Sequence, residues 1–224
     1  MADHYALQTG TAPLGGGRHG RLTVIDLGNL RVPSGQVGAC DPFVNLGNPV
    51  IVNVPSGDYP VRVTVADVSP EQDGSHLREA YLSLVLSPAE STAVEAAPGP
   101  TGPPPQGEFY VVPVSAGTVA FVDADAVARC MPHASTWYPD VFESADPNCW
   151  FDLMDADQPH PAGTANIVMP LAGDDENVVL SHSGWGDGRY PILQTRDANG
   201  ALTGIHIDLI VVGAFVGEPA SDPA

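Results

Sequence analysis

Short apolar runs recur along the chain, and glycine, proline, asparagine or aspartate separates each run from the next. Runs of this kind, bounded by turn residues, are typical of antiparallel strands. In 50–54 and 61–65 valines alternate with other residues, so one face of each strand is apolar. The connector 55–60 is rich in turn residues, and we therefore predict that these two strands form a hairpin. We predict further strands at 22–26, 30–33, 81–86, 109–114, 117–122, 165–171, 177–182, 190–194 and 201–212.

Helical signals in the sequence are few. Asp123 can cap a short helix that Pro132 ends, and a second short helix is expected around 148–154. The turn 197–200, Asp-Ala-Asn-Gly, predicts a hairpin between the last two strands. No unit repeats at a fixed period, and no long amphipathic helix occurs. The pattern therefore predicts a mainly β fold, an antiparallel β-sandwich or open barrel with a few short helices.

The length of 224 residues favours one β-rich domain, which we place over 21–216. The segment 1–20 is glycine-rich and is expected to be a flexible or draped N-terminal arm, with regular structure beginning near Arg21. Residues 217–224 are expected to form a C-terminal tail. Between 89 and 107 the composition shifts to proline, glycine, alanine, serine and glutamate. This segment is interpreted as a long surface loop within the domain.

The charge balance excludes several functions. Eight basic residues, all arginine, face 27 acidic residues, which gives a formal charge of −19. Without lysine the chain cannot supply a phosphate-loop lysine, a Schiff-base nucleophile or a lysine general base. Nucleic acid and membrane partners are not expected, because both are polyanionic surfaces. The acidity is interpreted either as a solvated surface or as a means of capturing a basic protein or a metal ion.

Three cysteines, Cys40, Cys130 and Cys149, are widely spaced and form no Cys-x-x-Cys pair. Neither a disulfide framework nor a structural zinc site is indicated, so buried thiols are expected. The polar start of the chain lacks the basic and apolar regions of a leader, and no apolar run reaches membrane-spanning length. A cytoplasmic location is expected.

Residues 181–190, Ser-His-Ser-Gly-Trp-Gly-Asp-Gly-Arg-Tyr, combine alternating glycines with reactive and aromatic side chains. Alternating glycines allow sharp turns and close approach of a ligand or another backbone. Asp187 is expected to hold its own turn or to act as a metal ligand, a general base or a partner contact. The hydrolase elbow Gly-x-Ser-x-Gly is not matched, which argues against a serine nucleophile. The candidate binding residues of this segment are Ser183, Trp185, Arg189 and Tyr190.

A second candidate element lies in the predicted last strand. His206 and Asp208 alternate with isoleucine and leucine, so both side chains project from the polar face. Their Cα atoms lie roughly 6.5 Å apart along a strand. The alternatives are that both face solvent, or that they join Asp187 as catalytic groups. With Asp123 the three would be ligands of a divalent metal ion, the one cofactor that these residues indicate.

Some motifs of the chain stand out when they are taken together: 34–35, 40–43, 55–61, Arg78, Ala80, Gly117, 121–123, 183–190 and Asp208. These segments resemble a bacterial family of unknown function, domain-of-unknown-function family 4241, whose members carry a Gly-Asp-Gly signature near the C-terminus. The resemblance spans about 21–212, and the hairpin motif and the last glycine-rich box are its most specific parts. It implies a common fold and a common aspartate-bearing site, and no reaction. Leu209 departs from the aromatic residue expected after Asp208.

Three functions are consistent with these residues. The first is an acidic binding module that captures a basic protein, as an immunity protein captures a toxin. The second is a metal-dependent hydrolase with its site at the Ser-Gly-Trp-Gly-Asp-Gly segment, built on Asp187, His206 and Asp208. The third is small-molecule binding in the mouth of a barrel, with Trp185 and Tyr190 as walls. The sequence does not define the oligomeric state.

Overall fold

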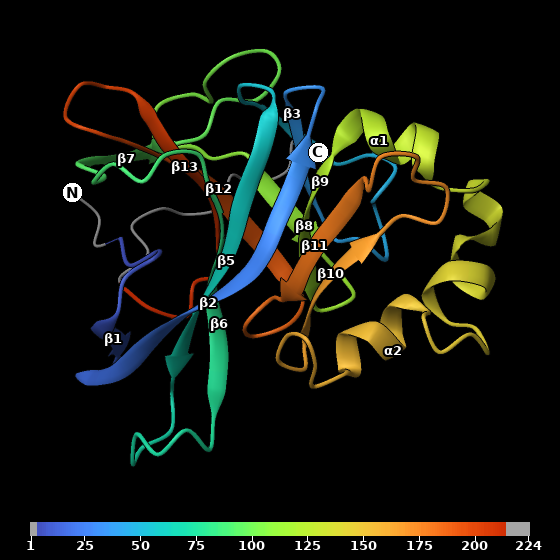
Figure 1. Cartoon of the computed structure of the whole chain (residues 1–224). Helices are drawn as coiled ribbons and strands as arrows, with labels where there is room; N and C mark the ends of the chain where they lie inside the picture. The colour runs from blue at the N-terminus through green and yellow to red at the C-terminus, as the bar shows by residue number, and fades with distance from the viewer. Residues whose placement is uncertain (1–3, 214–224) are drawn as a thin grey trace, which may run out of the picture.

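The computed structural model describes residues 4–213 as two antiparallel sheets with short helices on one side (Figure 1). The first sheet has the strand order β1-β2-β5-β6-β13-β12-β7, and β8 pairs with β12. The second sheet has the order β10-β11-β9-β3-β4. The strands are β1 (Gly10–Gly15), β2 (Arg18–Val32), β3 (Gln36–Cys40), β4 (Val50–Asn53), β5 (Gly57–Asp67), β6 (Leu77–Val85), β7 (Ala93–Ala96), β8 (Val111–Val114), β9 (Thr118–Asp123), β10 (Thr164–Val168), β11 (Asn177–His182), β12 (Gly188–Arg196) and β13 (Leu202–Asp208). The predicted fold class is confirmed.

The main core lies between the two sheets. Alternate residues of the first sheet, such as Val61, Val63 and Ile207, point inward and are fully buried. Phe121 and Val179 of the second sheet meet them from the other side. Each buried side chain of this size contributes about 1.5–3 kcal/mol to folding, so this core is the main source of stability.

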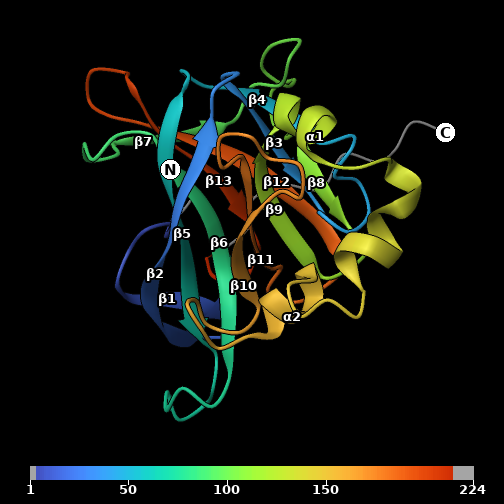
Figure 2. The same ribbon diagram turned by 45° about the vertical axis from the view of Figure 1, so that its right-hand side comes forward.

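A second core covers the outer face of the second sheet (Figure 2). Ala120 and Val122 of β9 point away from Phe121 and pack under Trp150 and Met154. Because helices cover this face, every residue of β9 is buried. The helical segments are α1 (Ala124–Cys130), the 3-10 helix η1 (Ala134–Thr136), the π-helix η2 (Trp137–Phe142) and α2 (Trp150–Asp155). No helix among residues 4–213 is long and apolar enough to cross a membrane.

The strand positions follow the predictions, but one predicted pairing is wrong. The strands at 50–54 and 61–65 do not form a hairpin: β4 pairs with β3 in the second sheet, and β5 pairs with β2 and β6 in the first. The predicted strands 22–26 and 30–33 are one strand, β2, with an irregularity in its register between Asp26 and Asn29. The hairpin around 197–200 joins β12 to β13 as predicted.

The segments predicted as irregular contain more structure than expected. Regular structure begins at Gly10, before Arg21, because β1 pairs with β2. The preceding residues lie over the first sheet, where the Leu7 amide donates to the Thr64 hydroxyl at 2.9 Å. Within 89–107, β7 adds to the edge of the first sheet by pairing with β12. The predicted tail 217–224 lies outside the described residues.

Candidate functional site

The glycine-rich segment connects the two sheets. It leaves β11 at His182 in the second sheet and enters β12 at Gly188 in the first. Ser183 is fully buried, and its hydroxyl donates to the Gly186 carbonyl at 2.6 Å. The Tyr190 hydroxyl donates to the same carbonyl at 2.7 Å. These two predicted binding residues therefore shape the connection itself, and their polar atoms are already occupied.

Asp187 stabilises a turn other than the one that contains it. Its side chain is exposed, and one carboxylate oxygen accepts a hydrogen bond from the Gly117 amide at 3.1 Å. Gly117 belongs to the turn between β8 and β9, which Asp41 holds from the other side. Asp41 is completely buried and accepts from the amides of Ser115 and Ala116 at 2.9 and 2.7 Å. Two carboxylates thus fix one turn at the junction of the sheets.

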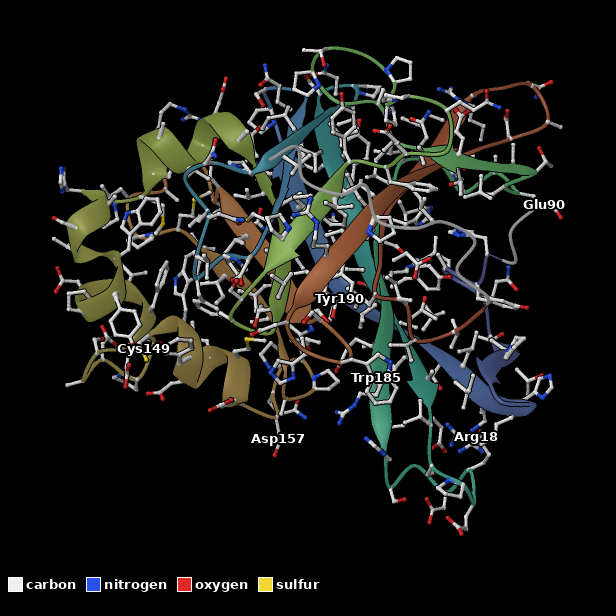
Figure 3. The ribbon with its side chains drawn as sticks, turned by 180° about the vertical axis from the view of Figure 1, so that it is seen from behind. Arg18, Glu90, Cys149, Asp157, Trp185 and Tyr190 are labelled. Carbon is white, nitrogen blue, oxygen red and sulfur yellow. The ribbon has the colours of Figure 1, made fainter. Side chains whose placement is uncertain are left out.

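Trp185 is the exposed part of the segment. Its side chain is 57% exposed, and the Arg78 guanidinium lies 5.4 Å from its ring centre (Figure 3). A pocket of about 450 Å³ beside it is lined by Glu79, His182 and the glycine-rich backbone. Burial raises the pKa of Glu79. Arg189, the remaining predicted binding residue, is exposed.

His206 is buried and neutral. Its Nδ1 lies 2.9 Å from the Ser83 hydroxyl and its Nε2 3.0 Å from the Thr195 hydroxyl. The His4 ring packs edge-on against it at 4.9 Å. Burial and the adjacent His4 lower the pKa of His206 well below its ordinary value. His206 therefore does not face solvent, which was one of the alternatives for this residue, and each of its ring nitrogens lies beside a hydroxyl.

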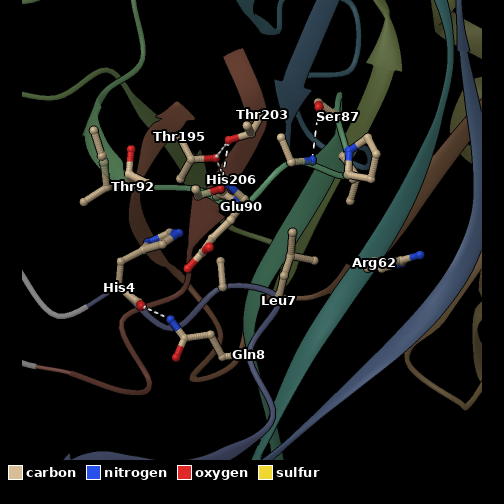
Figure 4. A pocket seen from close by; sticks show the side chains of 17 residues that line it. His4, Leu7, Gln8, Arg62, Ser87, Glu90, Thr92, Thr195, Thr203 and His206 are labelled. Carbon is tan, nitrogen blue, oxygen red and sulfur yellow. Dashed lines mark hydrogen bonds between the residues drawn. The ribbon is translucent and has the colours of Figure 1, made fainter. Parts of the chain in front are cut away.

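A pocket of about 590 Å³ lies over His206, between the N-terminal segment and the loop that carries Glu90 (Figure 4). Thr203 donates to Thr195, which contacts His206, so a chain of hydroxyls leads from this pocket to the imidazole. Burial lowers the pKa of His4 to about 4. The two histidines of the pocket wall are therefore neutral at pH 7, and Arg62 and Glu90 are its charged residues.

Asp208 has separate partners. It is half-buried, and its carboxylate accepts from the Ile210 amide at 2.9 Å. Burial raises the pKa of Asp208 to about 6, and a hydrogen bond with Tyr81 partly offsets that shift. Because this pKa exceeds that of the unfolded chain, Asp208 favours the folded state at acidic pH, and that contribution is lost as pH rises through about 6.

Asp123 has a structural role. It caps α1 by accepting from the Ala126 amide at 3.0 Å, as the sequence predicts. Its other oxygen accepts from the Ser34 amide and hydroxyl at 2.9 and 2.7 Å. Asp123 and Gly117 lie at opposite ends of β9, so Asp123 and Asp187 are separated by the length of that strand.

The predicted metal set is therefore not assembled. Asp187, His206, Asp208 and Asp123 each bond to a different partner. No group of three or more histidine, cysteine or carboxylate side chains in the described part of the chain is placed to hold a metal ion. The prediction of a metal-dependent hydrolase rested on these four residues acting together as ligands, and the structure does not bring them together.

Acidic residues are concentrated in the segment that carries the helices, and the sequence interpretation assigned no function to them. Nine exposed carboxylates occur within 124–175. The one arginine of this segment, Arg129, is paired with Glu176 at 3.1 Å. The signal was present in the sequence, because no arginine occurs between Arg129 and Arg189. We call these nine residues the acidic face: Asp125, Asp140, Glu143, Asp146, Asp152, Asp155, Asp157, Asp174 and Asp175.

The protein is thus a two-sheet antiparallel β protein. The glycine-rich segment and Asp41 shape the junction between its sheets, and the helical side carries the acidic face. The family model described as Protein of unknown function (DUF4241) matches residues 30–207, and the chain belongs to that family. The resemblance expected from the sequence is thereby confirmed. No curated protein and no solved structure matches the chain.

Proposed function

We propose that this protein is a binding module that captures a basic protein partner through the acidic face. The observation that carries the proposal is the imbalance of charge there: nine exposed carboxylates against one arginine that is already paired. Elsewhere individual arginines pair with acids, as in the pairs Arg62–Asp26 and Arg196–Glu95. Segment 124–175, about a quarter of the chain, carries nine acids and one arginine, a net charge of −8 out of the total of −19.

A surface of this kind acts mainly on the rate and selectivity of association. Charges within about 8–10 Å of one another interact at physiological salt, so neighbouring carboxylates repel and a basic partner relieves that repulsion. Electrostatic attraction raises association rates and rejects acidic competitors. The three cysteines are buried and unpaired, which supports placing this module in a reducing cytoplasm.

The test is capture of partners from a native lysate at low and high salt, with wild-type protein and two triple variants as bait. The face variant neutralises three exposed carboxylates of the acidic face: Asp155→Asn, Asp157→Asn and Asp174→Asn. The control variant neutralises three exposed carboxylates elsewhere: Glu71→Gln, Glu90→Gln and Glu108→Gln.

We expect a basic protein to be recovered at low salt by the wild type and the control, and several-fold less by the face variant. Both variants change the net charge equally, so a difference between them locates the binding surface. Recovery of no salt-sensitive basic partner, or equal losses in both variants, would contradict the proposal.

A second candidate, small-molecule binding beside Trp185, is supported by the pocket of about 450 Å³. Tyr190 is not one of its walls, because that side chain is buried and bonded to Gly186. A screen of metabolite-sized compounds by tryptophan fluorescence tests it. A ligand of this pocket should change the emission of the wild type and not that of Trp185→Phe.

A further inference from the structure

A groove of about 530 Å³ lies within the acidic face, between the helical segments and strand β10. The apolar part of its lining includes Val141 from η2, Leu153 from α2 and Ile167 from β10, and the polar residues Thr136, Asn148 and Asn166 line the rest beside two carboxylates. Trp150, almost completely buried in the second core, also contributes to the lining. On the β10 side Val168 is 54% exposed, so apolar surface continues out of the groove.

Two carboxylates stand in the lining of this groove. Asp140 and Asp146 are both exposed members of the acidic face. Asp146 is held in place because it accepts from the Asn148 amide at 2.8 Å and from the Asn148 side chain at 3.0 Å. Arg129, the one arginine of the segment, is paired with Glu176. The groove therefore combines apolar lining residues with a negative charge that no arginine of this segment neutralises.

We propose that this groove receives one arginine or lysine side chain of the basic partner. Such a side chain has an apolar stem and a cationic head, so it can contact Leu153 and Ile167 while its head lies near Asp140 and Asp146. A purely apolar occupant would desolvate the carboxylates without a partner, and an anionic one would be repelled. The inference rests on the proposed function and adds the position and chemistry of the anchor.

The probe is a fluorescein-labelled octapeptide of arginine, with fluorescence anisotropy as the readout. A second octapeptide, of 2,4-diaminobutyric acid, carries the same number of positive charges on stems of two carbons, because its side-chain amines stay protonated at pH 6. Its heads can reach the carboxylates of the surface, but its stems cannot fill the groove. We expect the arginine peptide to bind at least about fivefold more tightly, because only its stems bury apolar surface.

Matched variants separate the groove from the rest of the acidic face. Asp140→Asn with Asp146→Asn should weaken arginine-peptide binding roughly tenfold, because two partly desolvated charge contacts are lost. Asp155→Asn with Asp157→Asn removes the same charge outside the groove and should weaken binding about twofold, through long-range attraction alone. Asn at position 146 retains an acceptor for Asn148, so local folding is preserved.

The tryptophan indole signals in a 1H–15N spectrum give an independent position. The arginine peptide should shift the signal of Trp150, which lines the groove, and leave that of Trp185 unchanged. Two results would show that the groove is not the anchor while leaving the proposal for the acidic face intact. The first is equal affinity of the wild type for both peptides. The second is an equal loss of affinity in the two double variants together with an unchanged Trp150 signal. If the wild type binds neither peptide at low salt, the proposed function itself fails.

Discussion

The two carboxylates at the β8–β9 turn should differ sharply in what they contribute to stability. Asp41 is completely buried and accepts from three amides, those of Phe43, Ser115 and Ala116. Asp187 is exposed and accepts from one, that of Gly117. We expect Asp41→Asn to destabilise the protein strongly and Asp187→Asn to have little effect.

The magnitude follows from the hydrogen bonds. In Asp41→Asn the amide oxygen can stay on Ser115 and Ala116, and the NH2 group then faces the Phe43 amide. Two bonds lose their charge, at about 1 kcal/mol each, and one buried donor is left unsatisfied at about 1–3 kcal/mol, so the loss is about 3–5 kcal/mol. For a chain of this size that lowers Tm by about 6–20 °C. The exposed bond of Asp187 exchanges with water, so its loss is roughly 0.5 kcal/mol, or about 1–2 °C.

Thermal unfolding followed by circular dichroism measures both variants, and urea midpoints check the order. The two substitutions are chemically identical, so each serves as the control for the other. If Asp187→Asn lowers Tm as much as Asp41→Asn, or if Asp41→Asn is neutral, the junction is not held as the distances indicate.

Three further predictions concern other parts of the fold. The pKa values of His4 and His206 are lowered, so at these two residues the folded chain binds fewer protons than the unfolded one. Their contribution to the unfolding free energy should be full above pH 6.5 and fall toward pH 4, and His4→Gln should reduce that fall in urea titrations. Gly184 has φ 68°, and a Cβ there would lie 2.6 Å from the Glu79 carbonyl oxygen. Gly184→Ala should therefore cost about 2–4 kcal/mol by urea unfolding, against about 1 for Gly186→Ala, which meets nothing. The Cys40 thiol is buried with a raised pKa, so mass spectrometry should find it unmodified by iodoacetamide until the chain is unfolded.

Strand positions could be predicted because apolar alternation and turn residues are local signals. The partner of each strand could not, as the wrong hairpin shows. Val52 of β4 and Val63 of β5 alternate alike because both point into the main core, but they do so from opposite sheets. Alternation reports which face of a strand is buried and carries no information about which strand lies beside it.

The candidate site could likewise be predicted only in part: where the sequence indicated the role of a residue, it did not indicate its partner. A glycine-flanked aspartate indicates a turn stabilised by a carboxylate, and Asp187 has that role, but its partner Gly117 lies 70 residues away in the sequence. Asp41 was marked only as part of segment 40–43, which carries the family resemblance, and its role could not be predicted because its partner Ser115 lies 74 residues away in the sequence. The alternation of polar and apolar residues places His206 on the polar face of its strand. Only the fold shows that the segment around His4 covers that face.

The motifs behind the family resemblance are joined to one another in space. Ser34 bonds to Asp123, and Gly117 bonds to Asp187. Asp41 holds the turn just before Gly117. These contacts fix how the two sheets meet, which makes the signature a determinant of the fold rather than an assembled set of catalytic groups. The acidic face lies over the second core and takes no part in these contacts, so its charges can be changed without loosening the junction. If the acidic face binds the partner as we propose, fold and partner choice are carried by separate residues, and variants of each should leave the other intact.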